Sequence, residues 1–235
     1  MNNRVVPESP SPASAVLFDI DGTLIDSNYL HIHAWMRAFA EVGIDAAAWR
    51  IHRCIGMDGS ELVSTLSDDA PDDVQDRLTE LHSQFYQESA DLLKPLPGAL
   101  DLLNRVKALG LQVVLATSAP EDELTLLRKV LDSEDLYSAV TSSEDVETAK
   151  PEPAIVEIAL KRAGVGVDRA VFVGDAVWDI EACVRANLPS IGLLSGGVSR
   201  GELETAGATA VFEDAAELLA GLTETRIGHL AGERP

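Results

Sequence analysis

Short, continuously apolar runs alternate along most of the chain with segments whose apolar residues recur at helical spacing. The apolar runs, which are typical of buried strands, lie at residues 15–20, 111–116, 139–141, 170–173, 190–194 and 210–212. Helical patterns lie at residues 121–131, 154–163, 179–186 and 215–222, and another opens at Pro97-Gly98 and continues to residue 109. Strands that alternate with helices predict an α/β fold built on a doubly wound parallel sheet.

The stretch between the first two apolar runs breaks this alternation, because it has helical patterns and no convincing strand. Residues 28–42 form an amphipathic pattern, residues 49–66 are mixed around a turn at 56–59, and Pro71 suits the first turn of a long helix. The apolar stripe of that helix is expected at Val74, Leu78, Leu81, Phe85 and Leu92. We interpret residues 27–93 as a helical cap inserted into an α/β core made of residues 1–26 and 94–235. The cap is expected over the carboxyl end of the first strand, where open α/β sheets bind ligands.

Polar side chains gather directly after the predicted strands. Asp19 and Asp21 stand one residue apart at the end of the first run, so they are expected to point to the same side of the strand. Taken alone, this segment fits an ordinary Asp-Gly turn as well as a site. Further candidates follow the later runs at Thr117, Ser118, Lys150, Asp175 and Asp179. Since parallel strands end at one edge of a sheet, we expect these side chains to form one site.

The residue types in this set complement one another. Asp19 and Asp175 offer the hard oxygen ligands that Mg²⁺ takes from proteins. Lys150 adds a second positive charge, and the hydroxyl of Thr117 can hold phosphoryl oxygens. A carboxylate is the strongest nucleophile of the set, so the expected intermediate is a covalent aspartyl-phosphate.

The charge balance limits the classes of molecule that the protein is expected to bind. With 18 Lys and Arg against 39 Asp and Glu, the formal charge is −21 at pH 7, which opposes binding to nucleic acid or to an anionic membrane. A small phosphorylated substrate therefore needs a local positive charge, which the expected Mg²⁺ site and Lys150 would supply.

The rest of the composition bears on the compartment. Cys54 and Cys183 are far apart and have no metal-site spacing, which fits reduced thiols in a cytoplasm. Residues 1–14 lack the apolar core of a signal peptide, and no run reaches the roughly 18 apolar residues of a membrane span. We expect the N-terminal arm and residues 226–235 to be frayed ends.

Four segments, taken together and in order, resemble the motifs of the haloacid dehalogenase superfamily. They are Asp-Ile-Asp-Gly-Thr at 19–23, Thr117, Lys-Pro-Glu-Pro at 150–153 and Gly-Asp-Ala-Val-Trp-Asp at 174–179. The resemblance covers roughly residues 16–194. The helical insert after the first motif resembles the subclass with a helical cap, which includes enzymes of the phosphoglycolate phosphatase and β-phosphoglucomutase kinds.

This resemblance implies a role for each matching residue. Asp19 would be the nucleophile, Asp21 the general acid and then the base that activates water, and Thr117 a hydrogen-bond donor to the phosphoryl group. Lys150 would steady Asp19 and the phosphoryl group. Asp19, Asp175 and the backbone carbonyl of Asp21 would hold Mg²⁺, with Asp179 contacting it directly or through water.

The predicted cap carries weaker signals. Arg53 and the turn that begins at Gly56 resemble the substrate-specificity loop of this subclass, so both are expected to bind substrate together with Thr117, Ser118 and Lys150. Gly59 occupies the place where β-phosphoglucomutase-like members have a second arginine. His31 sits where such mutases have a histidine, but we expect His31 and His33 to be ordinary helix residues.

The function these features predict is a Mg²⁺-dependent phosphatase that acts on a small phosphorylated metabolite. A phosphomutase of the β-phosphoglucomutase type is the alternative, and Gly59 speaks against it. A binding protein that keeps the scaffold without catalysis is a further alternative, but every acid, the lysine and the hydroxyl of the site are present.

Overall fold

The computed structural model describes residues 13–146 and 150–232, and in them six strands form one parallel sheet of order β3-β2-β1-β4-β5-β6. The strands are β1 (Ala15–Phe18), β2 (Gln112–Ala116), β3 (Ala139–Thr141), β4 (Ala170–Gly174), β5 (Ser190–Leu193) and β6 (Ala210–Phe212). β1 lies in the middle, with Leu17 in register with Val114 of β2 on one side and Phe172 of β4 on the other. The predicted α/β fold with a parallel sheet is confirmed.

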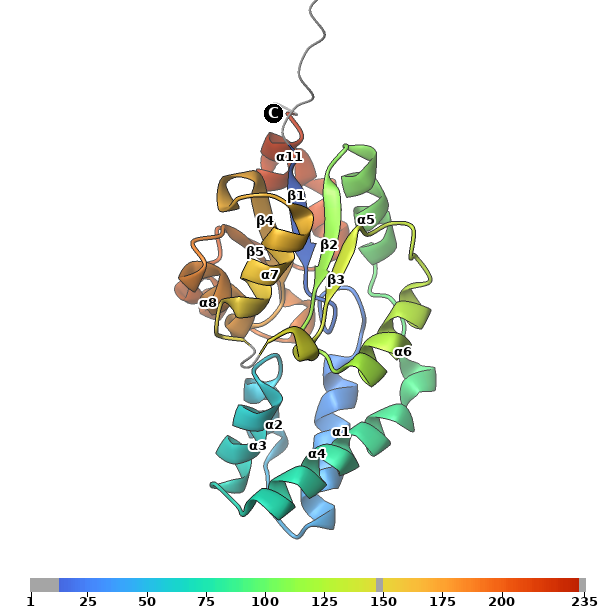
Figure 1. Ribbon diagram of the computed structural model, residues 1–235, viewed down its shortest axis with the longest axis vertical. Coiled ribbons are helices and arrows are strands. Elements are labelled where there is room, and N and C mark those ends of the chain that lie inside the picture. Colours follow the sequence, from blue (N-terminus) through green and yellow to red (C-terminus); the bar gives the residue numbers. More distant parts are fainter. Residues whose placement is uncertain (1–12, 147–149, 233–235) are drawn as a thin grey trace, which may run out of the picture.

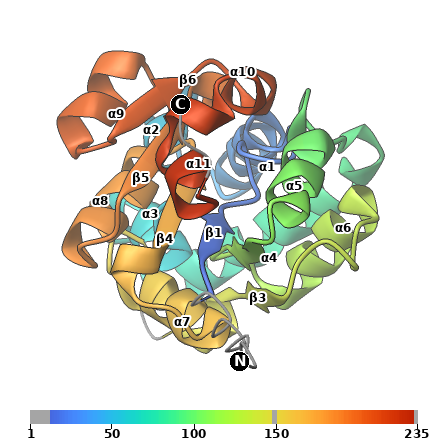
Figure 2. The same cartoon turned by 90° about the horizontal axis from the view of Figure 1, so that it is seen from above.

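Helices cover both faces of the sheet, as Figure 2 shows from above. One face carries α5 (Ala99–Ala108), α6 (Glu121–Leu131) and α10 (Ala215–Ala220), and the other carries α7 (Ala154–Ala163) and α8 (Val177–Arg185). Because side chains alternate along a strand, Val16 and Phe18 enter the first layer while Ala15 and Leu17 enter the second. α9 (Arg200–Ala206) packs beside α8 and β6. Burial on both faces explains why the strands are continuously apolar.

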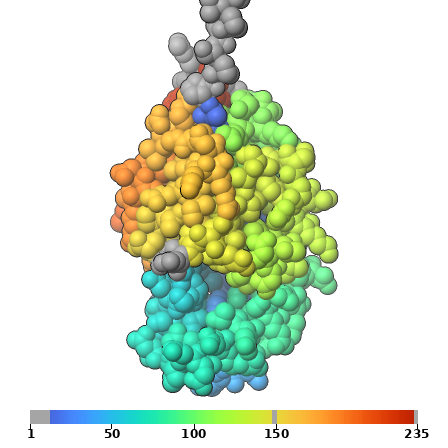
Figure 3. Space-filling view, in the orientation of Figure 1, coloured from blue at the N-terminus to red at the C-terminus, as the bar shows by residue number. Residues whose placement is uncertain are grey.

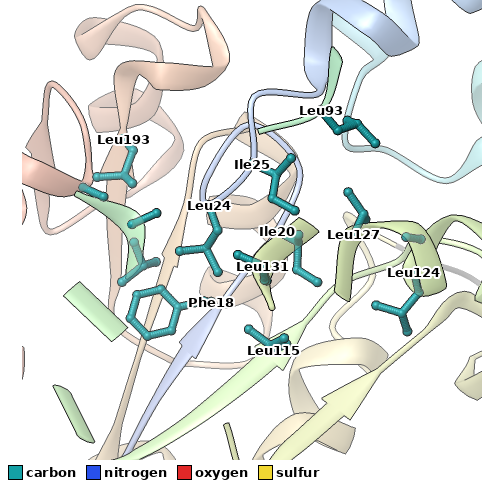
Figure 4. Close-up of a cluster of buried hydrophobic side chains, with 14 of the residues drawn as sticks. Phe18, Ile20, Leu24, Ile25, Leu93, Leu115, Leu124, Leu127, Leu131 and Leu193 are labelled. Carbon is teal, nitrogen blue, oxygen red and sulfur yellow. The ribbon is translucent and has the colours of Figure 1, made fainter. Parts of the chain in front are cut away.

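The turn after β1 is fixed by the same core. Figure 4 shows Ile20, Leu24 and Ile25 of this turn packed among leucines of α6. Gly22, between them, has a φ of +71°, a left-handed conformation that glycine adopts without steric cost. The backbone that carries Asp19 and Asp21 is therefore held by apolar contacts rather than by a loose loop.

Four further helices stand apart from the sheet, at the foot of the molecule in Figure 1. They are α1 (Asn28–Glu41), α2 (Ala48–Cys54), α3 (Gly59–Ser67) and α4 (Asp72–Gln87), and α1 packs along α4. The chain enters and leaves this group side by side, since the N–H of Asp26 donates to the carbonyl of Lys94 at 3.0 Å and the N–H of Leu96 to that of Leu24 at 2.9 Å. We propose that the boundaries of the cap, at residues 27 and 93, lie at this paired passage.

The structure differs from the sequence prediction at the end of one cap helix and near the C-terminus. The long cap helix stops at Gln87, and a short turn, η1 (Ala90–Leu92), leaves Leu92 exposed at 65% instead of in the apolar stripe. The prediction that residues 226–235 fray is wrong for α11 (Arg226–Leu230), where Ile227 is fully buried and the hydroxyl of Thr225 accepts from its N–H. The same expectation is wrong for Ser14 at the end of the N-terminal arm, which is buried and whose carbonyl accepts from the N–H of Gln112 at 2.9 Å, while residues 1–12 and 233–235 lie outside the described part.

The structure bears on two expectations, the state of the cysteines and the presence of a membrane-spanning helix. Cys54 and Cys183 are buried and unpaired. Among the described residues, no helix has both the length and the apolar character needed to cross a membrane.

Leu127 and Leu92 provide a matched test of this core. Leu127 of α6 is fully buried in the cluster of Figure 4, so Leu127→Ala should lower the free energy of unfolding by about 2–5 kcal/mol. Leu92→Ala removes the same atoms from an exposed site and should change it by no more than about 0.5 kcal/mol. Urea denaturation measures both, and equal losses would contradict the assigned packing.

Candidate active site

The candidate site lies where β1 and β4 end side by side. Asp19 follows β1, and its backbone N–H donates to the carbonyl of Val173 in β4 at 3.0 Å. Asp175 directly follows β4. β2 and β3 extend the sheet beyond β1, and β5 and β6 extend it beyond β4, so the order of the strands reverses between these two. Such a reversal opens a crevice at the carboxyl ends of the strands.

A buried lysine joins two aspartates in this crevice. Nζ of Lys150 lies 2.5 Å from Oδ1 of Asp19 and 2.6 Å from Oδ1 of Asp179, and the lysine is 2% exposed. Burial alone would lower the pKa of the Lys150 ammonium, but the carboxylates of Asp179 and Asp19 outweigh it and raise the pKa above its ordinary value. Lys150 therefore carries a positive charge at neutral pH.

Asp175 is held by donors from the segment after β1. Its Oδ1 accepts a hydrogen bond from the hydroxyl of Thr23 at 2.7 Å, and its Oδ2 accepts one from the amide of Asn28 at 2.8 Å. Burial, and after it the charge of Asp179, raises the pKa of Asp175 to about 7. Gly196, in η4 (Leu194–Gly196), passes so close that a Cβ there would overlap Oδ2 of Asp175.

The acids of this crevice fit a divalent cation. One carboxylate oxygen from each of Asp19, Asp175 and Asp179 lies within 4.8 Å of the others. Burial raises the pKa of Asp19 well above its ordinary value; Lys150 opposes the shift, while the charges of Asp179, Asp175 and Asp21 add to it. Several buried acids beside a single lysine leave an excess of negative charge that a divalent cation would neutralise, and carboxylate oxygens are ligands that hard divalent cations take.

Asp21 has a different environment, turned toward the cap. The hydroxyl of Ser27 donates to its Oδ1 at 2.6 Å, and Nε2 of His31 lies 3.3 Å from the same oxygen. Burial alone would raise the pKa of Asp21, but the hydrogen bond and charge of His31 and the Ser27 hydroxyl lower it. Burial likewise opposes a charge on His31, but Asp21 and Glu123 raise the pKa of its imidazole. The pair can therefore share one proton.

Further buried side chains of the cap helices and of α6 contact this pair in turn. Nδ1 of His31 in α1 lies 3.1 Å from Nε2 of His82 in α4, and Nδ1 of His82 lies 3.6 Å from Oε1 of Glu123 in α6. Tyr86 stacks on His31 with ring centroids 4.0 Å apart, and Trp35 stacks on His82 at 4.1 Å. Burial raises the pKa of Glu123 to about 7. The orientation of the His31 ring thus depends on both the cap and α6.

Thr117 and Ser118 follow β2 and face the same space. The hydroxyl oxygen of Thr117 accepts from the N–H of Ala119 at 3.0 Å, so its own proton is available to a ligand. The hydroxyl of Ser118 is buried and has no hydrogen-bond partner among the described residues. Two hydroxyls at the end of β2 can therefore donate to a bound anion.

These groups line one cavity of about 640 Å³ between the sheet edge and the cap. Figure 3 shows the surface drawn in at this level, between the cap helices in cyan and teal and the core above them. The sheet edge supplies Asp19, Asp21, Thr117, Ser118, Lys150, Asp175 and Asp179, while the cap supplies Ile55, Gly56, Met57 and Leu62 among others. Every candidate site residue expected from the sequence lines this cavity except Arg53.

Arg53 does not face the cavity in this structure. Its guanidinium forms an ion pair with Glu202 of α9 on the outer side of the crevice, and its carbonyl accepts from the indole N–H of Trp178 at 3.3 Å. Glu202 is distant from Arg53 in the sequence but close to it in space, and it pairs with the guanidinium. Arg53 is therefore left out of the substrate contacts proposed below.

Four side chains of the site were missed or undervalued by sequence reasoning. Asn28, His31, His82 and Glu123 are all buried and line the cavity. His31 carried a signal, since it matched a histidine of the mutases, but the helical pattern alone favoured an ordinary role. Asn28 had no signal beyond its place at the start of a helix.

Comparisons with known proteins agree with this geometry. Residues 16–193 match the model of the family described as haloacid dehalogenase-like hydrolase. The chain is 32% identical over 216 residues to a phosphoglycolate phosphatase of Rhodospirillum rubrum, a match that covers 87% of this chain and 88% of that protein. It is 28% identical over 179 residues to a phosphorylated carbohydrates phosphatase of Thermotoga maritima, covering 75% of this chain and 83% of that protein.

Solved structures of other proteins have the same fold. The crystal structure of a hydrolase from Pseudomonas syringae superposes with a TM-score of 0.86 at 39% identity, over 90% of this chain and 98% of that one. A structure described as a β-phosphoglucomutase from Bacteroides vulgatus superposes with a TM-score of 0.84 at 22% identity, over 93% of this chain and 90% of that one, and so shares the fold. The match covers both the sheet and the residues that gather at its edge, and the chain is an enzyme that belongs to the haloacid dehalogenase-like hydrolases.

Proposed function

We propose that this hydrolase is a phosphatase that removes the phosphoryl group from a small phosphorylated metabolite by way of an aspartyl-phosphate on Asp19. The observation that carries the proposal is the buried Lys150 ammonium, 2.5 Å from Asp19 and on the floor of the cavity. It holds the nucleophile in place and presents a positive charge to a phosphoryl group. The names of the relatives from Rhodospirillum rubrum and Thermotoga maritima support the same reaction class.

In the first step, a carboxylate oxygen of Asp19 forms a bond to phosphorus and the bond from phosphorus to the leaving oxygen breaks. Because Lys150 engages Oδ1, we assign the attack to Oδ2. Asp21 delivers a proton to the leaving oxygen, and the shared proton of the Asp21–His31 pair is its source. Thr117 and Ser118 donate hydrogen bonds to the phosphoryl oxygens.

In the second step, water attacks the phosphorus of the aspartyl-phosphate, and the bond to Asp19 breaks. Asp21 accepts the proton that the water loses, which regenerates the pair with His31. The direction of its pKa suits this step, since an Asp21 carboxylate that is ionised at neutral pH is a ready base.

We propose that Asp19, Asp175 and the carbonyl of Asp21 hold Mg²⁺, with Asp179 beside it. Mg²⁺ bound there would neutralise the carboxylates and stabilise the charge on the transferring phosphoryl group. We also place the enzyme in the cytoplasm, because a reducing compartment suits its two unpaired buried cysteines.

A phosphomutase would need a second site for the other phosphate of a bisphosphate. Among the described residues that line the cavity, Lys150 is the only lysine and there is no arginine. This observation favours transfer to water over transfer to a phosphorylated sugar.

The nucleophile is tested by Asp19→Asn. The amide is a poor nucleophile, so we expect phosphate release from p-nitrophenyl phosphate to fall by about 10³-fold or more. Asp91→Asn makes the same change at an exposed cap position outside the cavity and should leave the rate unchanged. Activity that survives in a folded Asp19→Asn protein would contradict the assignment.

Metal binding can be tested without turnover. Mg²⁺ that binds only the folded chain should raise the free energy of unfolding, by about 2.7 kcal/mol at a concentration 100 times its Kd. Asp175→Asn removes one expected ligand and should weaken this response to Mg²⁺. Thermal unfolding with and without the ion measures both, and a wild-type midpoint that ignores Mg²⁺ would count against the site.

The support of Asp21 is tested by His82→Phe, which keeps an aromatic ring against Trp35 and removes the hydrogen bond to His31. We expect kcat for an alkyl phosphate to fall by about tenfold or more, because its leaving oxygen needs a proton. The fall should be smaller with p-nitrophenyl phosphate, whose leaving group departs without one.

The matched control for that variant is His33→Phe, which makes the same change at an exposed position of α1 that does not line the cavity. It should leave both rates unchanged. Equal losses of kcat for the two substrates in His82→Phe would show that His82 matters for packing rather than for the proton on Asp21.

A further inference from the structure

The cavity extends from the proposed phosphoryl site at the sheet edge to the cap, and its far part limits what the rest of a substrate can be. Beyond the sheet edge, its wall is made by the cap and by the first turn of α6. Ile55, Met57 and Leu62 give that wall an apolar part, which suits a carbon skeleton. Ser60, Thr79 and Ser83 give it hydroxyl groups.

The charged residues of this far part are acidic. Asp58 lies before α3, Glu80 lies on α4, and Asp122 and Glu123 lie in the first turn of α6. Across the whole described lining there are eight acidic side chains, while Lys150 is the only lysine and no arginine is present.

Among these acids, Asp122 takes its hydrogen bonds from neutral donors. Oδ2 of Asp122 accepts hydrogen bonds from the Ser83 hydroxyl at 2.9 Å and the Gln87 amide at 3.0 Å, and both donors are neutral. Asp58 caps α3 by accepting from the N–H of Ser60 at 2.9 Å. Glu123 contributes less, because burial raises the pKa of its carboxyl to about 7.

Arg77 balances the charge of Glu80, whereas Arg53 and Lys150 are engaged away from this part of the cavity. Arg53 is paired with Glu202 outside the cavity, and Arg77 is paired with Glu80 at 3.0 Å without itself lining the wall. Lys150 is committed to Asp19 and Asp179 at the phosphoryl end. A second anionic group on a substrate would thus meet Asp122 without a lysine or arginine of the described lining to pair with it there.

We propose that the group esterified to the phosphate carries no negative charge and donates hydrogen bonds, as the hydroxyls of a sugar or polyol do. This inference rests on the proposed phosphatase function and names the substrate class of the same site. Hydroxyl donors find acceptors in Asp58, Asp122 and the serine and threonine oxygens, and the carbon skeleton lies against the apolar wall. A carboxylate or a second phosphate finds no lysine or arginine beyond Lys150 in the described lining, and the His31 ring is engaged with Asp21. The substrate class therefore differs from phosphoglycolate, which the name of the Rhodospirillum rubrum relative would suggest.

The test compares kcat/KM for two pairs of phosphate esters that differ only in charge. Glycerol 3-phosphate is paired with 3-phosphoglycerate, and 2-hydroxyethyl phosphate with 2-phosphoglycolate, so that a carboxylate replaces a CH₂OH group in each pair. We expect the uncharged member to be at least about tenfold better in both pairs, because the acidic wall repels the carboxylate. Carboxylates that are hydrolysed equally well or better would overturn the inference.

A pair of variants then tests whether the cavity wall causes the preference for the uncharged esters. Asp122→Lys places a positive charge on the far wall and should narrow the ratio in both pairs severalfold or more. Asp91→Lys makes the same change in net charge in η1, outside the cavity, and should leave the ratio as in the wild type. Ratios that Asp122→Lys does not change, or that Asp91→Lys changes equally, would show that the cavity wall is not their source.

Turnover of p-nitrophenyl phosphate separates this inference from the function on which it rests. If the wild-type enzyme hydrolyses that ester but prefers the carboxylates, the substrate class is wrong and the phosphatase assignment stands. If it hydrolyses none of the five esters in the presence of Mg²⁺, the proposed function fails and the substrate class fails with it.

Discussion

The ion pairs of Lys150 with Asp19 and Asp179 are the interaction on which the site depends. Each of these groups is nearly inaccessible to solvent, and each carboxylate lies close to further acids. A buried charge is costly unless it is paired, so the two aspartates keep the Lys150 ammonium charged, and the lysine in turn offsets part of the cost of burying the aspartates. The remaining excess of negative charge makes the same place attractive to a divalent cation and, through that cation, to a phosphoryl group.

The fold places this cluster by bringing distant segments to one sheet edge. Asp19 and Asp175 come from neighbouring strands, and Lys150 reaches them from the segment before α7. The cap then makes the two aspartates after β1 unequal. Asp19 lies among acids and a lysine at the sheet edge, whereas Asp21 faces Ser27 and the His31 ring. This division of environment is the physical basis for assigning one acid to attack and the other to proton transfer.

Much of the fold was predictable because the strands are short, fully apolar and buried on both sides. α6, α7 and β3 have the bounds that the sequence pattern indicates, and helices in the cap were expected where the alternation breaks. Leu92 was placed wrongly, because the apolar spacing continues past Gln87 while the helix ends there and Leu92 is left exposed. α11 was missed since its five residues carry little apolar pattern, and it packs both on the neighbouring turn η5 (Leu222–Glu224) and on β4.

The candidate site, too, was only partly predictable from the sequence. Residues that directly follow apolar strands could be found from their position, which is why Asp19, Thr117 and Asp175 stood out. The chain from His31 through His82 to Glu123 joins three helices, and no spacing within one helix indicates that these side chains meet. The pairing of Arg53 with Glu202 is equally invisible, because it depends on how α2 approaches α9. Such contacts follow from tertiary structure, and they decide the polarity of the far part of the cavity.

The most direct measurement is the identification of the group that carries phosphorus during turnover. Rapid acid quenching of the enzyme with substrate and Mg²⁺, followed by mass spectrometry of its peptides, should show a phosphoryl group on Asp19. In Asp21→Asn the base for the second step is lost, so this adduct should accumulate and approach one phosphoryl group per chain. A phosphoryl group on another residue, or steady turnover with no adduct at any quench time, would contradict the account.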